Sequence, residues 1–293
     1  MKRLNLIFLT LMISLGANAQ NFYLTASSGY SFGMNGDKLW LNNSKSYHIN
    51  NNQTGNFEYE GSQESVAFTL GKGFNFGASV GYNFNKYISV DLGINYLLGG
   101  KTKTTNYSEI TEIETDGTSS FRVDEDKYSD YSRMIRIMPT VVITPGFEKI
   151  NPYAKVGFVF SFGSYYSNSD YVSTTVGYPT YESTYNSEFS GGVSLGFNAA
   201  IGGMYELNDS WSVFGECSFI GSSYSPTKRE VVKLTRNGKD ELPTLSTYNK
   251  ETNFSNKIKT SSATPDYDQP REQLKIAFPL SSFGINFGVK MNF

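Results

Sequence analysis

The sequence offers very little for acid–base catalysis. His48 is the only histidine and the only candidate general base, and it stands in the stretch SKSYHIN close to Ser44 and Ser46. A single histidine with a serine and an acid would suit a barrel enzyme that acts on lipids or peptides. No acid or oxyanion donor can be placed beside His48 from the sequence. We therefore interpret His48 as a solvated loop residue and predict no catalytic residues, with a lipid-modifying enzyme as the less favoured alternative.

Ligands for metals and cofactors are equally scarce. With one histidine and one cysteine, Cys217, the chain cannot form an internal disulfide or a metal site built on several such ligands. The stretch GKGFNFG (71–77) is superficially similar to a glycine-rich nucleotide-binding loop. Its glycines alternate as in a strand and no strand–helix–strand unit follows, so we reject a nucleotide site there. In LLGGKTKT (97–104) the first glycine of a P-loop is replaced by Asn95. We predict no metal and no cofactor.

Charged residues alternate with apolar ones at several places in the chain. Six of them stand at the alternate positions that are polar in segments where every second residue is apolar: Asp91, Arg136, Lys155, Glu206, Glu216 and Lys290. Charges inside a narrow barrel are costly unless they are paired. We predict an interior ion-pair network that stabilises the fold, with Arg136 and Glu216 as its main members. A small pore with a charged interior is the alternative, because many glycines share this parity and leave room for water.

The elements that position these charges are predicted strands with one apolar and one polar face. Apolar residues, many of them aromatic, recur at every second position in eight segments, at 22–32, 74–84, 88–98, 135–143, 155–163, 193–202, 211–219 and 283–293. Strands of about 9–11 residues are long enough to cross a membrane when they are tilted. Hydropathy scans miss such spans because the polar residues lie between the apolar ones.

The connections between these strands alternate in length. Short polar turns are expected at 85–86, 148–152 and 208–210, and long stretches at 33–65, 102–131, 167–187 and 222–273. This plan is typical of an outer-membrane barrel whose turns and termini face the periplasm. In the last long stretch, 231–235 precedes Asn237-Gly238, a favoured hairpin turn. Whether the neighbouring strands continue there or a separate hairpin forms stays open, and ten membrane strands are less favoured than eight.

The beginning of the chain has the features of a secretory signal peptide. Lys2 and Arg3 precede an apolar run at 4–15, and Ala17-Asn18-Ala19 follows as a cleavage site. We predict a signal peptide at 1–19 and an outer-membrane barrel domain at 20–293. The predicted fold class is all-β: a closed, antiparallel, up-and-down transmembrane barrel. A soluble periplasmic β-sandwich is the rival fold.

The C-terminal pattern Val289-Lys290-Met291-Asn292-Phe293, together with the signal peptide and the alternating strands, resembles that of a known group of proteins. The chain resembles small outer-membrane barrels of the OmpA/OmpX-like superfamily, and more specifically the "outer membrane beta-barrel protein" families of Bacteroidetes. The resemblance implies a place in the cell outer membrane, among its lipids. It also implies that the last strand, through Phe287, Val289, Met291 and Phe293, is read by the barrel-assembly machinery. The superfamily has structural, adhesive, pore-forming and enzymatic members, so the resemblance indicates the cellular location of the protein better than its function.

The long stretches are rich in Tyr, Asn, Ser and Thr, which suit adaptable surface contacts. We therefore expect a non-enzymatic role in envelope structure or in recognition of a surface ligand or host partner. With 25 basic and 27 acidic residues, the chain lacks the charge excess that a nucleic-acid partner requires. Tyr165 and Tyr166 are expected in an aromatic girdle at the membrane interface.

Overall fold

The computed structural model describes residues 21–34, 42–258 and 264–293. The predicted signal peptide, residues 1–19, lies outside the described residues. Nearly all regular structure is β-strand, so the predicted all-β class is confirmed. Among the residues that the structure describes, no helix combines the length and the apolar character that a membrane-spanning helix needs.

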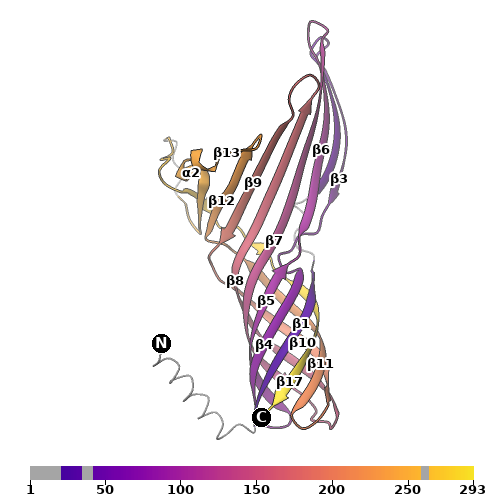
Figure 1. Cartoon of the computed structure of the whole chain (residues 1–293), viewed down its shortest axis with the longest axis vertical. Helices are drawn as coiled ribbons and strands as arrows, with labels where there is room; N and C mark the ends of the chain where they lie inside the picture. Colours follow the sequence, from indigo (N-terminus) through magenta and orange to yellow (C-terminus); the bar gives the residue numbers. More distant parts are fainter. Residues whose placement is uncertain (1–20, 35–41, 259–263) are drawn as a thin grey trace.

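Eight strands pair in a ring in the lower part of the molecule (Figure 1). They are β1 (Phe22–Gly33), β4 (Gly73–Asn83), β5 (Ile88–Gly99), β7 (Ser119–Ile143), β8 (Ile150–Thr175), β10 (Ser194–Glu206), β11 (Trp211–Tyr224) and β17 (Ser282–Asn292). Each is antiparallel to the next, and β17 pairs with both β11 and β1. Every ring strand thus pairs with a neighbouring strand on both of its sides.

The alternation of the sequence decides which side chains face out of the ring. Phe158 is 62% exposed on the outer face, whereas Arg136 is 1% exposed on the inner face. The exposed outer positions are apolar on every ring strand and include Leu24, Phe76, Leu92, Ile135, Phe158, Leu195, Val213 and Phe287. The buried inner positions are mostly polar and include Ser31, Asn75, Asp91, Asn95, Ser161, Ser194, Asn198 and Asn286. The ring therefore has the reverse of the polarity expected for a water-soluble fold.

Short turns join neighbouring strands at one end of the ring, which we call the turn end. Between β4 and β5 the Asn85 side-chain oxygen accepts hydrogen bonds from the amides of Tyr87 and Ile88, at 2.8 and 2.9 Å. Between β10 and β11 Asn208 accepts in the same way from the amides of Ser210 and Trp211, at 3.0 and 2.9 Å. These Asx turns explain why the chain reverses within so few residues.

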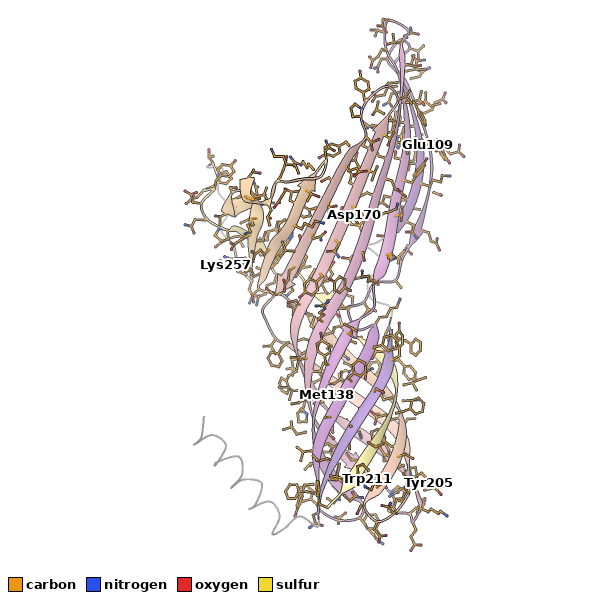
Figure 2. The ribbon with its side chains drawn as sticks, in the orientation of Figure 1. Glu109, Met138, Asp170, Tyr205, Trp211 and Lys257 are labelled. Carbon is orange, nitrogen blue, oxygen red and sulfur yellow. The ribbon has the colours of Figure 1, made fainter. Side chains whose placement is uncertain are left out.

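The long connections leave from the opposite end, the loop end, and most of their residues form strands. The additional elements are β2 (Asn42–Asn51), β3 (Asn56–Ser65), β6 (Thr102–Ile113), β9 (Tyr181–Ser190), β12 (Lys228–Arg236), β13 (Lys239–Asp240), η2 (Leu242–Thr244), α2 (Thr247–Lys250), β14 (Glu251–Ser255), β15 (Arg271–Leu274) and β16 (Phe278–Pro279). We call the sheet formed by β2, β3, β6, β9, β12–β15 and the loop-end halves of β7 and β8 the projecting sheet. It rises above the ring in Figure 1, and Figure 2 shows its side chains on both faces.

The long stretches that the sequence indicated as loops contain the strands of the projecting sheet. β7 and β8 run on from the ring and stay paired as far as Arg122 and Thr175. β6 and β9 pair along their outer sides, and β2 joins β6 in parallel. The Asn237-Gly238 turn is confirmed between β12 and β13, where both residues have positive φ, at 47° and 77°.

Candidate functional site

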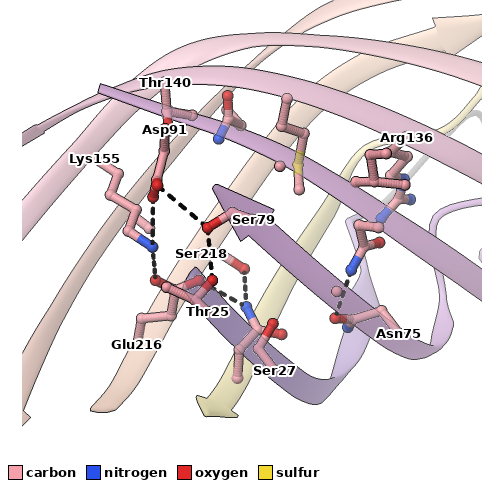
Figure 3. A pocket seen from close by; sticks show the side chains of 18 of the residues that line it. Thr25, Ser27, Asn75, Ser79, Asp91, Arg136, Thr140, Lys155, Glu216 and Ser218 are labelled. Carbon is pink, nitrogen blue, oxygen red and sulfur yellow. Dashed lines mark hydrogen bonds and ion pairs between the residues drawn. The ribbon is translucent and has the colours of Figure 1, made fainter. Parts of the chain in front are cut away.

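Three of the six predicted interior charges form one cluster on the inner face of the ring (Figure 3). Lys155 on β8 places its Nζ 3.1 Å from a carboxylate oxygen of Glu216 on β11. The same Nζ lies 3.8 Å from a carboxylate oxygen of Asp91 on β5. One largely buried cation, with a side chain 18% exposed, therefore lies between two carboxylates that come from distant parts of the sequence.

Hydroxyl and amide groups donate further hydrogen bonds to the two carboxylates of this cluster. Tyr153 donates its hydroxyl to Glu216 at 2.9 Å, and the Asn286 amide donates to the other Glu216 oxygen at 3.3 Å. Ser79 donates to Asp91 at 3.2 Å, and Thr25 lies 2.6 Å from the Ser79 hydroxyl. A buried ion pair is stable only when its remaining oxygens and protons are satisfied in this way.

Arg136 lies outside this cluster, so Lys155, rather than Arg136, is the partner of Glu216. The ion pairs among the described residues do not include Arg136, and its Nε and Nη2 find no hydrogen-bond acceptor there. Strand register is the reason. Arg136 pairs across from Ser161 on β8, six residues from Lys155, or about 20 Å along the strand.

Glu206 and Lys290 lie toward the turn end of the ring and take no part in an ion pair of the described residues. The Lys290 Nζ lies 3.8 Å from the centroid of the Tyr23 ring, close enough for a cation–π contact. Both residues line a turn-end cavity of about 560 Å³. A smaller central cavity of about 90 Å³ is lined by Arg136 and the Lys155 cluster. Thr25, Asp91, Lys155 and Phe214 line both cavities.

Apolar side chains fill the loop end of the ring, and we call this group the apolar cover. It consists of Phe68, Leu70, Leu97, Met134, Tyr165, Tyr224 and Leu280, with Phe189 and Phe278 packed against it. Leu97, Tyr224 and Leu280 are fully buried. Hydrogen bonds to the backbone hold it together, because the Leu70 amide donates to the Pro279 carbonyl at 2.8 Å and Ser132 donates to the Leu70 carbonyl at 2.7 Å.

The apolar cover was not predicted from the sequence, although the positions of two apolar residues before the last strand indicated it. Phe278 and Leu280 occupy the alternate positions that are polar in the last strand. Their side chains therefore lie inside the mouth of the ring. Tyr165 also faces inward, which corrects its expected place in a girdle, and its hydroxyl donates to Asp130 at 2.5 Å. Burial raises the pKa of the Asp130 carboxyl, and the Tyr165 hydrogen bond opposes that shift.

His48 lies on β2 in the projecting sheet, away from the ring. Its Nε2 is 3.1 Å from the Ser46 hydroxyl, and its ring contacts those of Phe57 and Tyr59 at centroid distances of 6.0 and 4.9 Å. Ser44 donates instead to Asn106 at 2.9 Å. No carboxylate of the described residues bonds to His48, so the histidine and serine lack the acid that such a mechanism uses.

The residues predicted as an assembly signal lie on β17 or directly after it. Phe287, Val289 and Phe293 are 65%, 42% and 52% exposed. Met291 shares their parity and pairs across from Leu24 on β1. In the described part of the chain no group of three His, Cys, Asp or Glu side chains is arranged to hold a metal ion.

Comparisons with known proteins add little. No family model matches the chain, and no curated protein matches it. Among solved structures, the crystal structure of Acinetobacter baumannii CarO2 aligns with the chain with a TM-score of 0.30 and 10% identity over 92% of this chain and 99% of that chain. For Acinetobacter baumannii CarO the TM-score is 0.27, with 13% identity over 74% of this chain and 92% of that chain.

Proposed function

We propose that the chain is a non-enzymatic protein of the bacterial outer membrane, in which the eight-strand ring is a closed transmembrane barrel. The observation that carries the proposal is the belt of exposed apolar side chains around a ring with a polar interior. In hydrocarbon every backbone group needs an internal partner, and strands paired on both sides provide one. Phe287, Val289, Met291 and Phe293 would then serve the barrel-assembly machinery.

The function that we propose is the presentation of the projecting sheet at the cell surface for recognition. β7 and β8 continue from the ring into this sheet without interruption, so the sheet is a direct extension of two ring strands. β3 lies at its edge and is exposed along its whole length, with Phe57 and Tyr59 at 64% and 55% exposure. An exposed strand edge with large aromatic side chains is suited to binding another protein chain.

Trypsin treatment of intact cells tests this presentation. Lys239, exposed at the β12–β13 turn, is expected to be cleaved on intact cells, whereas Lys86 and Lys149 at the turn end are expected to need cell lysis. A variant with Arg236→Gln and Lys239→Gln lacks the trypsin sites at this turn, so loss of the cleavage product in this variant identifies the turn as the site of cleavage. Cleavage at Lys86 before lysis, or protection of Lys239 until lysis, would contradict the proposed orientation.

The alternative of a small pore makes a different prediction. Because the apolar cover fills the loop end of the ring, we expect the wild-type chain to give no single-channel current in planar bilayers. Leu280→Asp places a charge within the cover, which should loosen it and cause intermittent current. Steady current through the wild-type chain would contradict the closed interior and favour the pore.

A further inference from the structure

A cluster of cations and aromatic rings lies on the outside of the molecule at the loop end of the ring. We call Lys101, Tyr131, Arg133 and Tyr166 the rim patch. Tyr131 on β7 and Tyr166 on β8 pair across the strands, and their rings stack with centroids 5.0 Å apart and planes at 17°. Arg133 places its Cζ 6.0 and 5.7 Å from these two rings, and the Lys101 Nζ lies 5.7 Å from the Tyr131 ring. Two cations thus approach one aromatic ring.

The rim patch borders the apolar belt directly. Arg133 is exposed and pairs across from Leu98 on β5, which is 43% exposed. Two residues further along β7, Ile135 continues the same outward face at 49% exposure. A molecule bound at the rim patch could therefore lie along Leu98 and Ile135 with any apolar part that it carries.

The positive charge of the rim patch is not balanced by neighbouring carboxylates. Neither Lys101 nor Arg133 takes part in an ion pair of the described residues, and Glu188 reaches only the Tyr166 hydroxyl, at 3.3 Å. Lys103 adds a further exposed cation on β6. Elsewhere in the projecting sheet the contrast is clear, because Lys228 pairs with both Glu230 and Glu251. Because Glu188 offsets only part of this charge and forms no ion pair with Lys101 or Arg133, the cations are stabilised by binding an anion.

We propose that the rim patch binds the phosphate of a phosphorylated lipid headgroup in the leaflet on the loop side. Arginine and lysine are the side chains that bind phosphate, and tyrosines anchor at the boundary between lipid and water. The adjoining Leu98 and Ile135 provide an apolar surface for the acyl chains, which a free anion would not use. This inference rests on the proposed membrane location of the ring.

The test compares lipid retention by the full mature chain in nanodiscs of phosphatidylcholine with and without lipid A, a phosphorylated glycolipid. Native mass spectrometry of the released protein should find lipid A bound to the wild-type chain. The double variant Lys101→Gln, Arg133→Gln should retain at least about tenfold less, the factor that corresponds to losing about 1.4 kcal/mol of binding. The matched variant Lys86→Gln, Lys149→Gln, at the turn end, should retain as much as wild type.

Three outcomes would overturn the inference: equal retention by the rim and turn-end variants, equal retention of lipid A and its dephosphorylated form, or displacement of lipid A by millimolar inorganic phosphate. None of these affects insertion into nanodiscs of phosphatidylcholine alone. Failure of insertion would instead contradict the proposed membrane location, so the two proposals fail in distinguishable ways.

Discussion

Replacing Lys155 by methionine is expected to lower the free energy of unfolding by about 3–5 kcal/mol, the effect of removing one partner from a buried ion pair. The variant leaves Asp91 and Glu216 facing each other without the cation that lies 3.8 and 3.1 Å from them. Methionine has a similar length, so the loss of charge rather than of volume causes the change. Urea unfolding in phosphatidylcholine vesicles, followed by gel mobility of unheated samples, measures it.

Two variants control for this prediction. Lys86→Met removes an exposed lysine at the turn end of the same ring and should change stability by less than about 0.5 kcal/mol. The triple variant Asp91→Asn, Lys155→Met, Glu216→Gln makes the whole cluster neutral and should recover most of the lost stability. If Lys155→Met alone were neutral, the cluster would not be the energetic unit that its contacts indicate.

Replacing Arg136 by methionine is expected to have the opposite effect and to raise the free energy of unfolding by about 1–3 kcal/mol, the cost of a buried polar group without a partner. Arg136 is a buried cation whose Nε and Nη2 have no acceptor among the described residues, so its desolvation is not compensated. The same vesicle unfolding assay measures the change.

Arg136→Lys is the matched control, because it keeps the buried charge and should bring no stabilisation. A loss of stability in Arg136→Met as large as that in Lys155→Met would show that the guanidinium has a favourable partner. Opposite signs for the two buried cations would separate a paired charge from an unpaired one within the same ring.

The ring strands could be predicted from the sequence because a period of two persists through each of them. Phe287 and Val289 face outward and Asp91 and Glu216 face inward, as their parity predicted. Parity determines the face of a strand but not the height at which a residue meets its neighbours. For this reason parity could not show which of the predicted interior cations lies beside Glu216, whereas register places Lys155 there.

The part of the projecting sheet formed by β2 and β3 could not be predicted because these two strands bury no apolar face, unlike β12, in which Val231 and Leu234 are buried. β3 (Asn56–Ser65) is exposed at every position, so its hydropathy carries no strand signal. It pairs with β2 through a local turn, but the parallel pairing of β2 with β6 joins segments that are distant in the sequence. The apolar cover likewise joins Leu70 to Leu280 across most of the chain, and only the parity slip near Phe278 hinted at it.

The membrane location of the ring is tested most directly at Cys217, the only cysteine of the chain. It is exposed on the outer face of β11, between Ile201 of β10 and Ile285 of β17. In phosphatidylcholine vesicles we expect a charged, water-soluble maleimide to leave Cys217 unlabelled until urea unfolds the chain. A variant with Cys217→Ser and Val176→Cys, at a position 69% exposed just beyond the end of β8, should be labelled at once. Rapid labelling of Cys217 in the folded, vesicle-bound chain would contradict a ring embedded in lipid.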